Sequence, residues 1–262
     1  MMPLITFVLP FYNEEAYLPA TLASLAAQDD RRFALRLVDN GSTDESAAIV
    51  RHATERMGDI RVECLEERRP GKLFALASGC RGIETPFIGT LDADTIYPPG
   101  YVGTILDEFA RDERAAAVLA LHDDFSRPGK AGLVKWLQIA LRPAHCHSGG
   151  WGQAFRRDAF EEVGGFDPAR WPFVLENHEI VHQVARFGPI RYRRDHVIRT
   201  SDRRSERTSV GWTLGERLAY KVVPGRAGSW FFHRVLAPRF SRRGLDTTAL
   251  RAGEWRDQPL SK

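Results

Sequence analysis

The chain is poor in cysteine and has no long apolar runs. Its 262 residues include three cysteines, Cys64, Cys80 and Cys146, whose spacing fits neither a disulfide framework nor a metal site. We therefore expect reduced thiols and a cytoplasmic protein. No apolar stretch approaches the roughly 18 residues that a membrane-spanning helix needs. Met1–Ile5 lacks the basic segment of a signal peptide, so we expect no such leader.

Positive charge is scarce early in the chain and abundant later. Residues 1–185 carry 19 Lys or Arg against 27 Asp or Glu, and residues 186–262 carry 18 against 7, so a net charge of +3 combines −8 with +11. The basic part is either a solvated face or the site of an anionic partner. We expect a phosphate-bearing substrate or an acidic membrane surface on the inner face of the membrane, and no nucleic acid. The stretch Trp230–Phe240 fits an interfacial helix on lipid, a helix packed on the domain, or a dimer contact.

Strand and helix signals alternate through the first half. Short apolar runs predict strands at residues 4–9, 33–38, 60–65, 87–91 and 115–121. Helical patterns begin at Asn13, at Thr43, at Gly71 and at Tyr101. This order predicts an α/β fold with a doubly wound, mostly parallel sheet flanked by helices, whose ligands lie beyond the carboxyl ends of the strands.

The second half is less regular. Its patterns predict helices at residues 133–141, 155–164 and 176–186, and short strands at 190–193 and 197–199. The tail beyond Ser241 is polar, and we expect it to be loosely ordered. We expect one domain at residues 1–210, with halves at 1–121 and 122–210, and a basic helical extension at 211–262.

Two carboxylates end the strand predicted at residues 87–91. Asp92 and Asp94 stand two residues apart at the edge of the sheet. Paired ionised carboxylates repel each other unless a cation lies between them, and hard divalent cations prefer oxygen ligands. We expect Mg²⁺ or Mn²⁺ to bind here together with a substrate diphosphate. The alternative is a pair of acids on a solvated loop.

Five segments, in order, resemble the family 2 glycosyltransferases, which are inverting enzymes with the GT-A fold. The resemblance covers about residues 3–200. The segments that carry it are Val8–Glu15, Val38–Asp44, Gly71–Gly79, Leu91–Asp94, and Ala154–Phe160 with Val163–Asp167. It implies transfer of a sugar from a nucleoside diphosphate sugar, with a UDP-type donor most expected. The implied acceptor is a polysaccharide, a lipid-linked molecule or a small molecule. The domain at residues 1–210 is then expected to be a glycosyltransferase domain, with a nucleotide-binding half at 1–121 and an acceptor half at 122–210.

The resemblance also implies roles for individual residues. Asp92 and Asp94 would bind the metal, and Glu14 and Asp39 would contact the nucleoside. Arg203 and Arg204 add positive charge that suits phosphate oxygens, unless they belong to a solvated basic loop. The remaining candidates for substrate binding are Pro10, Tyr12, Asn40, Ser42, Gly71, Lys72, Ala93 and Trp151.

The chain departs from the family at the helix that supplies the base. The family usually has Glu-Asp there, with the Asp as general base, but this chain has Glu176 followed by Asn177. A neutral amide cannot accept the proton of an acceptor hydroxyl. Either Glu176 or Glu179, one helical turn apart, takes over. Otherwise the chain is a non-catalytic sugar-nucleotide-binding protein. A nucleotidyltransferase is a further alternative, although its glycine-rich opening is absent from Leu9–Asn13.

Overall fold

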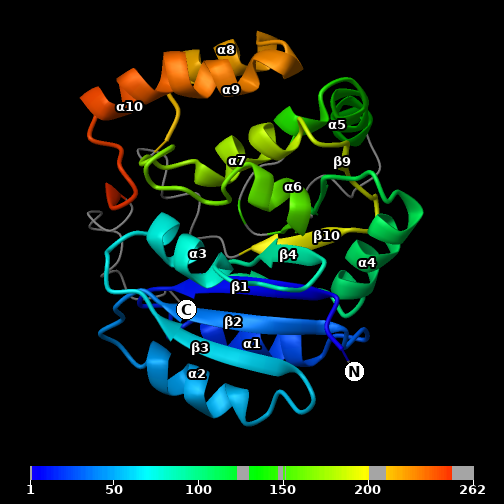
Figure 1. Cartoon of the computed structure of the whole chain (residues 1–262), viewed down its shortest axis with the longest axis vertical. Coiled ribbons are helices and arrows are strands. Elements are labelled where there is room, and N and C mark those ends of the chain that lie inside the picture. Colours follow the sequence, from blue (N-terminus) through cyan, green and yellow to red (C-terminus); the bar gives the residue numbers. More distant parts are fainter. Residues whose placement is uncertain (1, 123–129, 147–149, 151, 201–210, 250–262) are drawn as a thin grey trace.

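A seven-stranded sheet forms the centre of the computed structural model, which describes residues 2–122, 130–146, 150, 152–200 and 211–249 (Figure 1). In spatial order its strands are β3 (Arg61–Glu66), β2 (Phe33–Asp39), β1 (Ile5–Phe11), β4 (Phe87–Thr90), β8 (Gln153–Arg156), β6 (Ala117–Leu119) and β9 (Ile190–Arg191). The pairs β1–β2, β2–β3, β1–β4 and β6–β9 are parallel. The predicted doubly wound, mostly parallel sheet is therefore confirmed.

One strand of this sheet was not expected. β8 runs antiparallel between β4 and β6, and its Phe155 and Arg156 lie where the sequence predicts the start of a helix. Helix α6 (Arg157–Glu162) begins only after the strand ends. The helix predicted at 155–164 is therefore wrong over its first two residues. β8 has four residues and is paired on both sides, so its pairing is decided by tertiary position rather than by a local pattern.

A second sheet of three short strands lies beside the first. β10 (Val197–Thr200) pairs antiparallel with β5 (Thr95–Ile96) and parallel with β7 (Leu121–His122). Because β5 starts directly after Asp94, this pairing fixes the far side of the two-carboxylate segment. The sheet thus joins residues 95–96 and 121–122 to residues 197–200.

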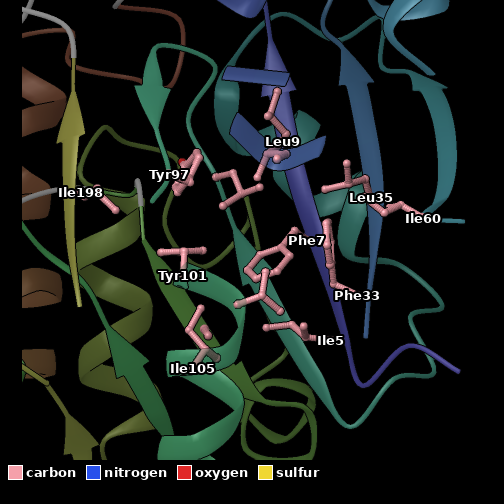
Figure 2. Packing of buried hydrophobic residues seen from close by; sticks show 14 of the residues in the cluster. Ile5, Phe7, Leu9, Phe33, Leu35, Ile60, Tyr97, Tyr101, Ile105 and Ile198 are labelled. Atoms are coloured by element: carbon pink, nitrogen blue, oxygen red, sulfur yellow. The ribbon is translucent and has the colours of Figure 1, made fainter. Parts of the chain in front are cut away.

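The central sheet is covered on both faces because the side chains of β1 alternate. Ile5, Phe7 and Leu9 enter a core that also contains Tyr101 (Figure 2). Val8 points to the other face. The first core includes residues of α1 (Leu18–Ala26), α2 (Ser46–Thr54) and α4 (Tyr101–Arg111). The second includes residues of α3 (Lys72–Cys80), α6 and α7 (Glu176–Val184).

Helix α3 lies unusually close to the sheet. A β-carbon at Gly79 would stand 2.4 Å from Cγ1 of Val8 and 2.8 Å from Cγ2 of Val38. Only a glycine at this position allows the helix to pack so near to β1 and β2. The close packing sets the position of Gly71 and Lys72 at the start of α3, above the carboxyl ends of the strands.

The C-terminal helices enclose a third core. They are α8 (Leu214–Val222), α9 (Gly228–Trp230), a π-helical turn at Phe231–Leu236 and α10 (Ala237–Arg242). Phe231, Phe232 and Phe240 are at most 2% exposed and pack in the cluster that holds Trp171. The aromatic residues of Trp230–Phe240 thus favour the packed-helix alternative over lipid contact, apart from Trp230, which is 58% exposed.

The described part of the chain continues past Ser241 with defined contacts. Val174 donates its amide hydrogen to the carbonyl of Leu245 (3.1 Å), and Thr247 donates to the carbonyl of Pro172 (3.0 Å). The expectation of a loosely ordered tail is therefore wrong for residues up to 249. Residues 250–262 lie outside the described part.

Candidate active site

The loops that follow β1 and β2 hold each other at the carboxyl edge of the sheet. Asn13 has a left-handed backbone (φ 51°), which asparagine tolerates better than most residues. Its amide donates to Oγ of Ser42 (3.2 Å), and its side-chain oxygen accepts from the amide of Thr43 (2.8 Å). The sequence predicts that helices begin at Asn13 and at Thr43. The structure shows that this is wrong, because α1 begins at Leu18 and α2 at Ser46. Asn13 and Thr43 instead fasten the loop that carries Glu14 to the loop that follows Asp39.

Asp39 and Asn40 end β2 with their side chains bound to the backbone. Asp39 Oδ1 accepts from the amide of Ser42 (2.8 Å). Asn40, 3% exposed, donates through Nδ2 to the carbonyls of Glu67 (2.7 Å) and Arg69 (2.8 Å) and accepts from the amide of Gly71 (2.9 Å). We infer that Asn40 positions the loop before α3 and does not itself contact substrate.

The start of α3 meets the C-terminal segment of the chain. Gly71 has φ 130°, and a β-carbon there would lie 2.7 Å from Cγ2 of Thr247. Oγ1 of Thr247 accepts from the amide of Leu73 (3.2 Å), which is one of the helix donors without an intrahelical partner. The sequence showed no sign of this contact, because Thr247 lies 174 positions after Leu73 in a polar stretch.

The two carboxylates after β4 are buried, and hydrogen bonds fix the backbone of this segment at Asp92 and at Ala93. Asp92 and Asp94 are 6% and 8% exposed. The amide of Asp92 donates to the hydroxyl of Tyr97 (2.9 Å), and the carbonyl of Ala93 accepts from the hydroxyl of Thr21 (2.7 Å). The side chain of Ala93 packs in the first core, so only its main chain faces the site.

This pair of acids fits a hard divalent cation. Oδ1 of Asp92 forms an ion pair with Nζ of Lys72, so a positive charge already stands beside one carboxylate. Carboxylate oxygens are the ligands that Mg²⁺ and Mn²⁺ prefer. Among the described residues no cluster of three or more His, Cys, Asp or Glu forms a metal site. The two carboxylates would therefore share such a cation with oxygens from a substrate diphosphate and water.

Gly150 brings the second half of the chain against this pair. A β-carbon at Gly150 would stand 3.3 Å from Nζ of Lys72 and 3.4 Å from Cβ of Asn177. The carbonyl of Gly150 accepts from the hydroxyl of Thr90 (3.0 Å), the last residue of β4. The carbonyl of Asn177 accepts from Nε2 of Gln153 (2.9 Å). Gly150 thus lies next to Lys72, which pairs with Asp92, and next to Asn177 at the start of α7, where Glu176 also lies.

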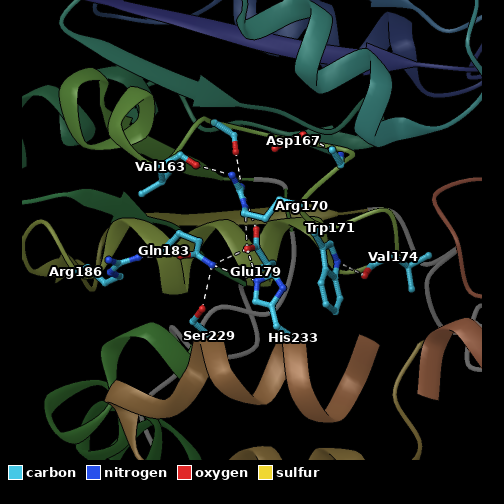
Figure 3. A network of polar contacts seen from close by, with 12 residues as sticks. Val163, Asp167, Arg170, Trp171, Val174, Glu179, Gln183, Arg186, Ser229 and His233 are labelled. Carbon is cyan, nitrogen blue, oxygen red and sulfur yellow. Dashed lines mark hydrogen bonds and ion pairs between the residues drawn. The ribbon is translucent and has the colours of Figure 1, made fainter. Parts of the chain in front are cut away.

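The two candidate bases on α7 have different surroundings, although every residue of this helix is buried. Figure 3 shows Glu179 at the centre of a polar network. Its oxygens accept from Nε (3.0 Å) and a terminal nitrogen (3.2 Å) of Arg170 and from Nε2 of Gln183 (2.8 Å), and His233 Nε2 lies 3.1 Å away. Burial acts to raise the pKa of Glu179, but the hydrogen bonds from His233 and Arg170 outweigh it and lower the pKa.

The network makes Glu179 a poor proton acceptor. Its carboxylate is 2% exposed, and Arg170 also donates to the carbonyls of Val163 (2.5 Å) and Gly165 (2.5 Å), so the pair ties the loop before α7 to the helix. We infer a structural role for Glu179. Glu176, 9% exposed and beside Asn177, remains the candidate base.

The remaining predicted residues divide into those near the edge and those not described. Pro10 is buried and pairs with Val38 near the end of β1, and Tyr12 is half-buried in the loop that follows. Trp151, Arg203 and Arg204 lie outside the described residues.

The chain matches known proteins in sequence. The pattern of glycosyl transferase family 2 matches residues 6–164. The undecaprenyl-phosphate 4-deoxy-4-formamido-L-arabinose transferase of Sodalis glossinidius is 33% identical over 111 residues, which are 41% of this chain and 34% of that protein. The enzyme of the same name from Pseudomonas aeruginosa strain LESB58 is 35% identical over 111 residues, 41% of this chain and 33% of that protein. The chain thus spans about a third of the length of these relatives.

Solved structures share the fold. A mannosyltransferase from Pyrobaculum calidifontis, in complex with GDP-mannose and Mn²⁺, superposes with a TM-score of 0.65 at 20% identity, covering 97% of this chain and 76% of that one. TarS residues 1–349 from S. aureus give a TM-score of 0.63 at 15% identity, covering 92% and 74%. The glucosyl-3-phosphoglycerate synthase of Mycobacterium tuberculosis gives 0.55 at 20% identity, covering 93% and 81%. These likenesses confirm the GT-A fold.

Proposed function

The chain belongs to glycosyl transferase family 2, and we propose that it transfers a sugar from a nucleoside diphosphate sugar to its acceptor with inversion and with help from Mg²⁺ or Mn²⁺. The observation that carries this proposal is the arrangement that places both Lys72, the ion-pair partner of Asp92, and Asn177 next to Gly150. It joins the edge where a donor diphosphate fits to the helix where an acceptor would be activated.

The donor side supplies orientation and positive charge. Glu14 stands on one of the two interlocked loops and Asp39 ends the strand before the other, where they can bind the nucleoside, and we assign a UDP-type donor to them. Lys72 lies at the first position of α3, so both its ammonium and the helix N-terminus favour an anion. When bound, the divalent cation neutralises charge that develops on the leaving diphosphate. The mannosyltransferase structure with GDP-mannose and a glucosyl-3-phosphoglycerate synthase structure with UDP also contain Mn²⁺.

The acceptor side must remove a proton if the acceptor is a hydroxyl. Glu176 takes that proton in our proposal, because Asn177 is neutral and Glu179 is committed to Arg170 and His233. Inversion then follows from direct attack of the acceptor oxygen on the anomeric carbon, opposite to the departing diphosphate.

A phosphate acceptor is the second candidate, and Asn177 favours it. A phosphate monoester is largely ionised at pH 7, since its second pKa is about 6, so it needs no general base. An amide beside it avoids the repulsion that a carboxylate would cause. The similar arabinose transferases are named for undecaprenyl phosphate, a lipid-linked phosphate.

Titration of UDP into the protein tests the donor side. We expect binding in Mn²⁺ that weakens at least about tenfold in EDTA, and we expect Asp94→Ala to abolish the Mn²⁺-dependent part because it removes a metal ligand. Asp59→Ala is the matched control, since Asp59 is an exposed acid paired with Arg31. Equal affinity in EDTA and Mn²⁺ would remove the metal from the proposal.

The same preparations test the acceptor side with Glu176→Gln. With a hydroxyl acceptor the variant should keep UDP binding but lose about 10²–10⁴ in turnover, the usual contribution of a general base. With a polyprenyl phosphate as acceptor the loss should stay below about tenfold, because no proton has to be removed. Donor binding without transfer to either class of acceptor, in the wild type, would instead point to a sugar-nucleotide-binding protein.

A further inference from the structure

Helix α5 (Lys130–Leu141) exposes its apolar residues to solvent. Leu133, Val134, Leu137 and Leu141 are between 54% and 72% exposed. At 3.6 residues per turn, positions 133, 137 and 141 form one stripe, and position 134 lies beside it. Large apolar side chains gathered on one exposed face indicate a surface that binds another protein or a membrane.

The same helix buries Lys135, one of its two lysines. Lys135 is 9% exposed, and its Nζ donates to the carbonyl of Cys146. Burial lowers the pKa of Lys135 because it disfavours the charged form. A surface helix in water normally has the opposite arrangement, with lysine outside and leucine inside. α5 instead exposes an apolar stripe to solvent, although Trp136 and Ile139 of the same helix pack against the second core.

Helix α8 repeats this arrangement. Leu214, Leu218 and Val222, again four residues apart, are between 54% and 74% exposed. The polar Glu216 faces inward at 2% exposed and is bound by Arg243 (2.8 Å). Two helices, 73 residues apart along the chain from Leu141 to Leu214, thus carry the same outward apolar stripe.

The two stripes meet at their C-terminal ends. Arg142 donates to the carbonyls of Lys221 and Val223, so Leu141 and Val222 each stand next to the contact. Both helices lie at the same end of the molecule in Figure 1, away from β1–β3. Trp230 on α9 is 58% exposed. We call Leu133, Val134, Leu137, Leu141, Leu214, Leu218 and Val222 the α5–α8 face.

The exposed charged residues that α8 carries beside this face are basic. Arg217 and Lys221 are exposed on α8, each one position before a residue of the stripe. α5 contains no acid, and the one acid of α8, Glu216, is buried and paired. A face made of leucines with a cationic border complements a bilayer of anionic lipid, where the side chains enter the acyl boundary and the basic groups meet the headgroups.

We propose that the α5–α8 face docks on the surface of an anionic lipid bilayer. The described residues contain no helix that is both long and apolar enough to cross a bilayer, so α5 and α8 would lie in the plane of the interface. This docking does not depend on the sugar-transfer chemistry proposed above. It would bring the acceptor half of the protein to the place where a lipid-linked acceptor resides.

Flotation of the full chain with vesicles tests the proposal. The vesicles contain phosphatidylglycerol and phosphatidylethanolamine in equal parts, and a second set contains phosphatidylcholine alone. We expect binding to the anionic set and at least about tenfold weaker partitioning for the triple variant Leu133→Gln/Leu137→Gln/Leu141→Gln, and likewise for Leu214→Gln/Leu218→Gln/Val222→Gln. Arg217→Gln/Lys221→Gln should lower partitioning severalfold and reduce its dependence on salt.

Controls separate docking from folding and from catalysis. Met2→Gln removes an 85% exposed apolar side chain at the far end of the molecule and should bind vesicles as the wild type does. UDP titration in Mn²⁺ without vesicles should be the same in every variant, which shows that the fold and donor site are intact. Unchanged partitioning of both triple variants, or no vesicle binding by the wild type, would overturn the proposal. A concentration-dependent dimer that both triple variants abolish would assign the face to a second copy of the chain.

Discussion

Residues 1–121, the proposed nucleotide-binding half, and residues 122–210, the proposed acceptor half, place their polar groups in opposite ways. In the first half, Asp39, Asn40 and Asp92 lie at or just after strand ends. Asp39 and Asn40 bind the backbone of neighbouring loops, and Asp92 pairs with the ammonium of Lys72. In the second half, buried groups such as Glu179 and Lys135 bind other protein groups in the interior, while leucines face outward. The two halves share one central sheet.

This difference shows that the two halves are vulnerable at different points. The first half depends on single side chains that each satisfy several backbone groups, so that loss of one side chain loosens a loop. The second half depends on paired interior groups, so that loss of one partner leaves the other buried without compensation. The following predictions test whether the contrast is real, beginning with the largest expected effect.

Removing the charge of Glu179 should have the largest effect on stability. We expect Glu179→Gln to lower the free energy of unfolding by about 3–5 kcal/mol, because Arg170 is left without its buried counter-ion. Glu66→Gln is the matched control, since Glu66 and Arg68 form an exposed pair that should be worth less than about 1 kcal/mol. Urea unfolding measures both. Equal losses for the two variants would contradict the contrast, and the double variant Arg170→Met/Glu179→Leu should recover part of the loss.

Removing Asn40 should have the next largest effect and should act on the donor site. Asn40→Ala loses three hydrogen bonds to the backbone, so we expect a loss of roughly 2–3 kcal/mol in unfolding free energy. UDP affinity should also fall, since Gly71 and Lys72 are no longer held in place. Thr54→Ala, at the end of helix α2, loses only a local hydrogen bond to the carbonyl of Arg51 and should change stability by less than about 0.5 kcal/mol. A destabilised variant with full UDP affinity would show that the loop does not need Asn40 for its function.

Acidification should destabilise the acceptor half through its histidines. Burial lowers the pKa of His178 to about 3, and burial together with Arg142 lowers the pKa of His145 to about 4. The unfolded chain binds protons below the ordinary pKa of about 6.5 while the native state does not. Each such histidine therefore leaves the free energy of unfolding unchanged above about pH 6.5. Below that pH, it lowers the free energy of unfolding by about 1.4 kcal/mol per pH unit as the pH drops toward 4.

Urea unfolding between pH 7 and pH 5 measures this slope, because few carboxylates titrate in that range. His178→Asn should reduce the dependence of the unfolding free energy on pH by the contribution of one histidine. A slope that stays the same in the variant would mean that His178 takes up its proton in the native state as readily as in the unfolded chain.

Much of the fold could be predicted from the sequence because the first half is locally consistent. The strands at β1, β2 and β4 fall where apolar runs end in polar clusters, and the helix at residues 133–141 is confirmed within α5. β8 could not be predicted, because its four residues show no alternation of polar and apolar side chains. Its antiparallel position between β4 and β6 depends on the tertiary fold. Asn13 and Thr43 resemble helix caps in sequence, but they bind each other's loops.

Only those residues of the candidate site that lie at the ends of strands could be placed from the sequence. Asp92 and Lys72 meet because β4 and the start of α3 share the sheet edge, which alternation of elements already suggests. The difference between Glu176 and Glu179 could not be seen, because it depends on Arg170 and on His233, more than fifty positions downstream. The outward leucines of α5 also escaped notice, since an apolar stripe does not tell which way a helix faces.

The contact between Thr247 and the start of α3 has a consequence for how the chain is made. Residues 5–91 leave the ribosome early and contain the strands of the nucleotide-binding half, yet the amide of Leu73 receives its partner only when a residue 174 positions later has emerged. Domains commonly fold in order of synthesis, from the N-terminus. Here the start of α3 lacks this hydrogen-bond partner until a segment 174 positions later has been made, so a residue synthesised much later completes a part of the fold that was made earlier.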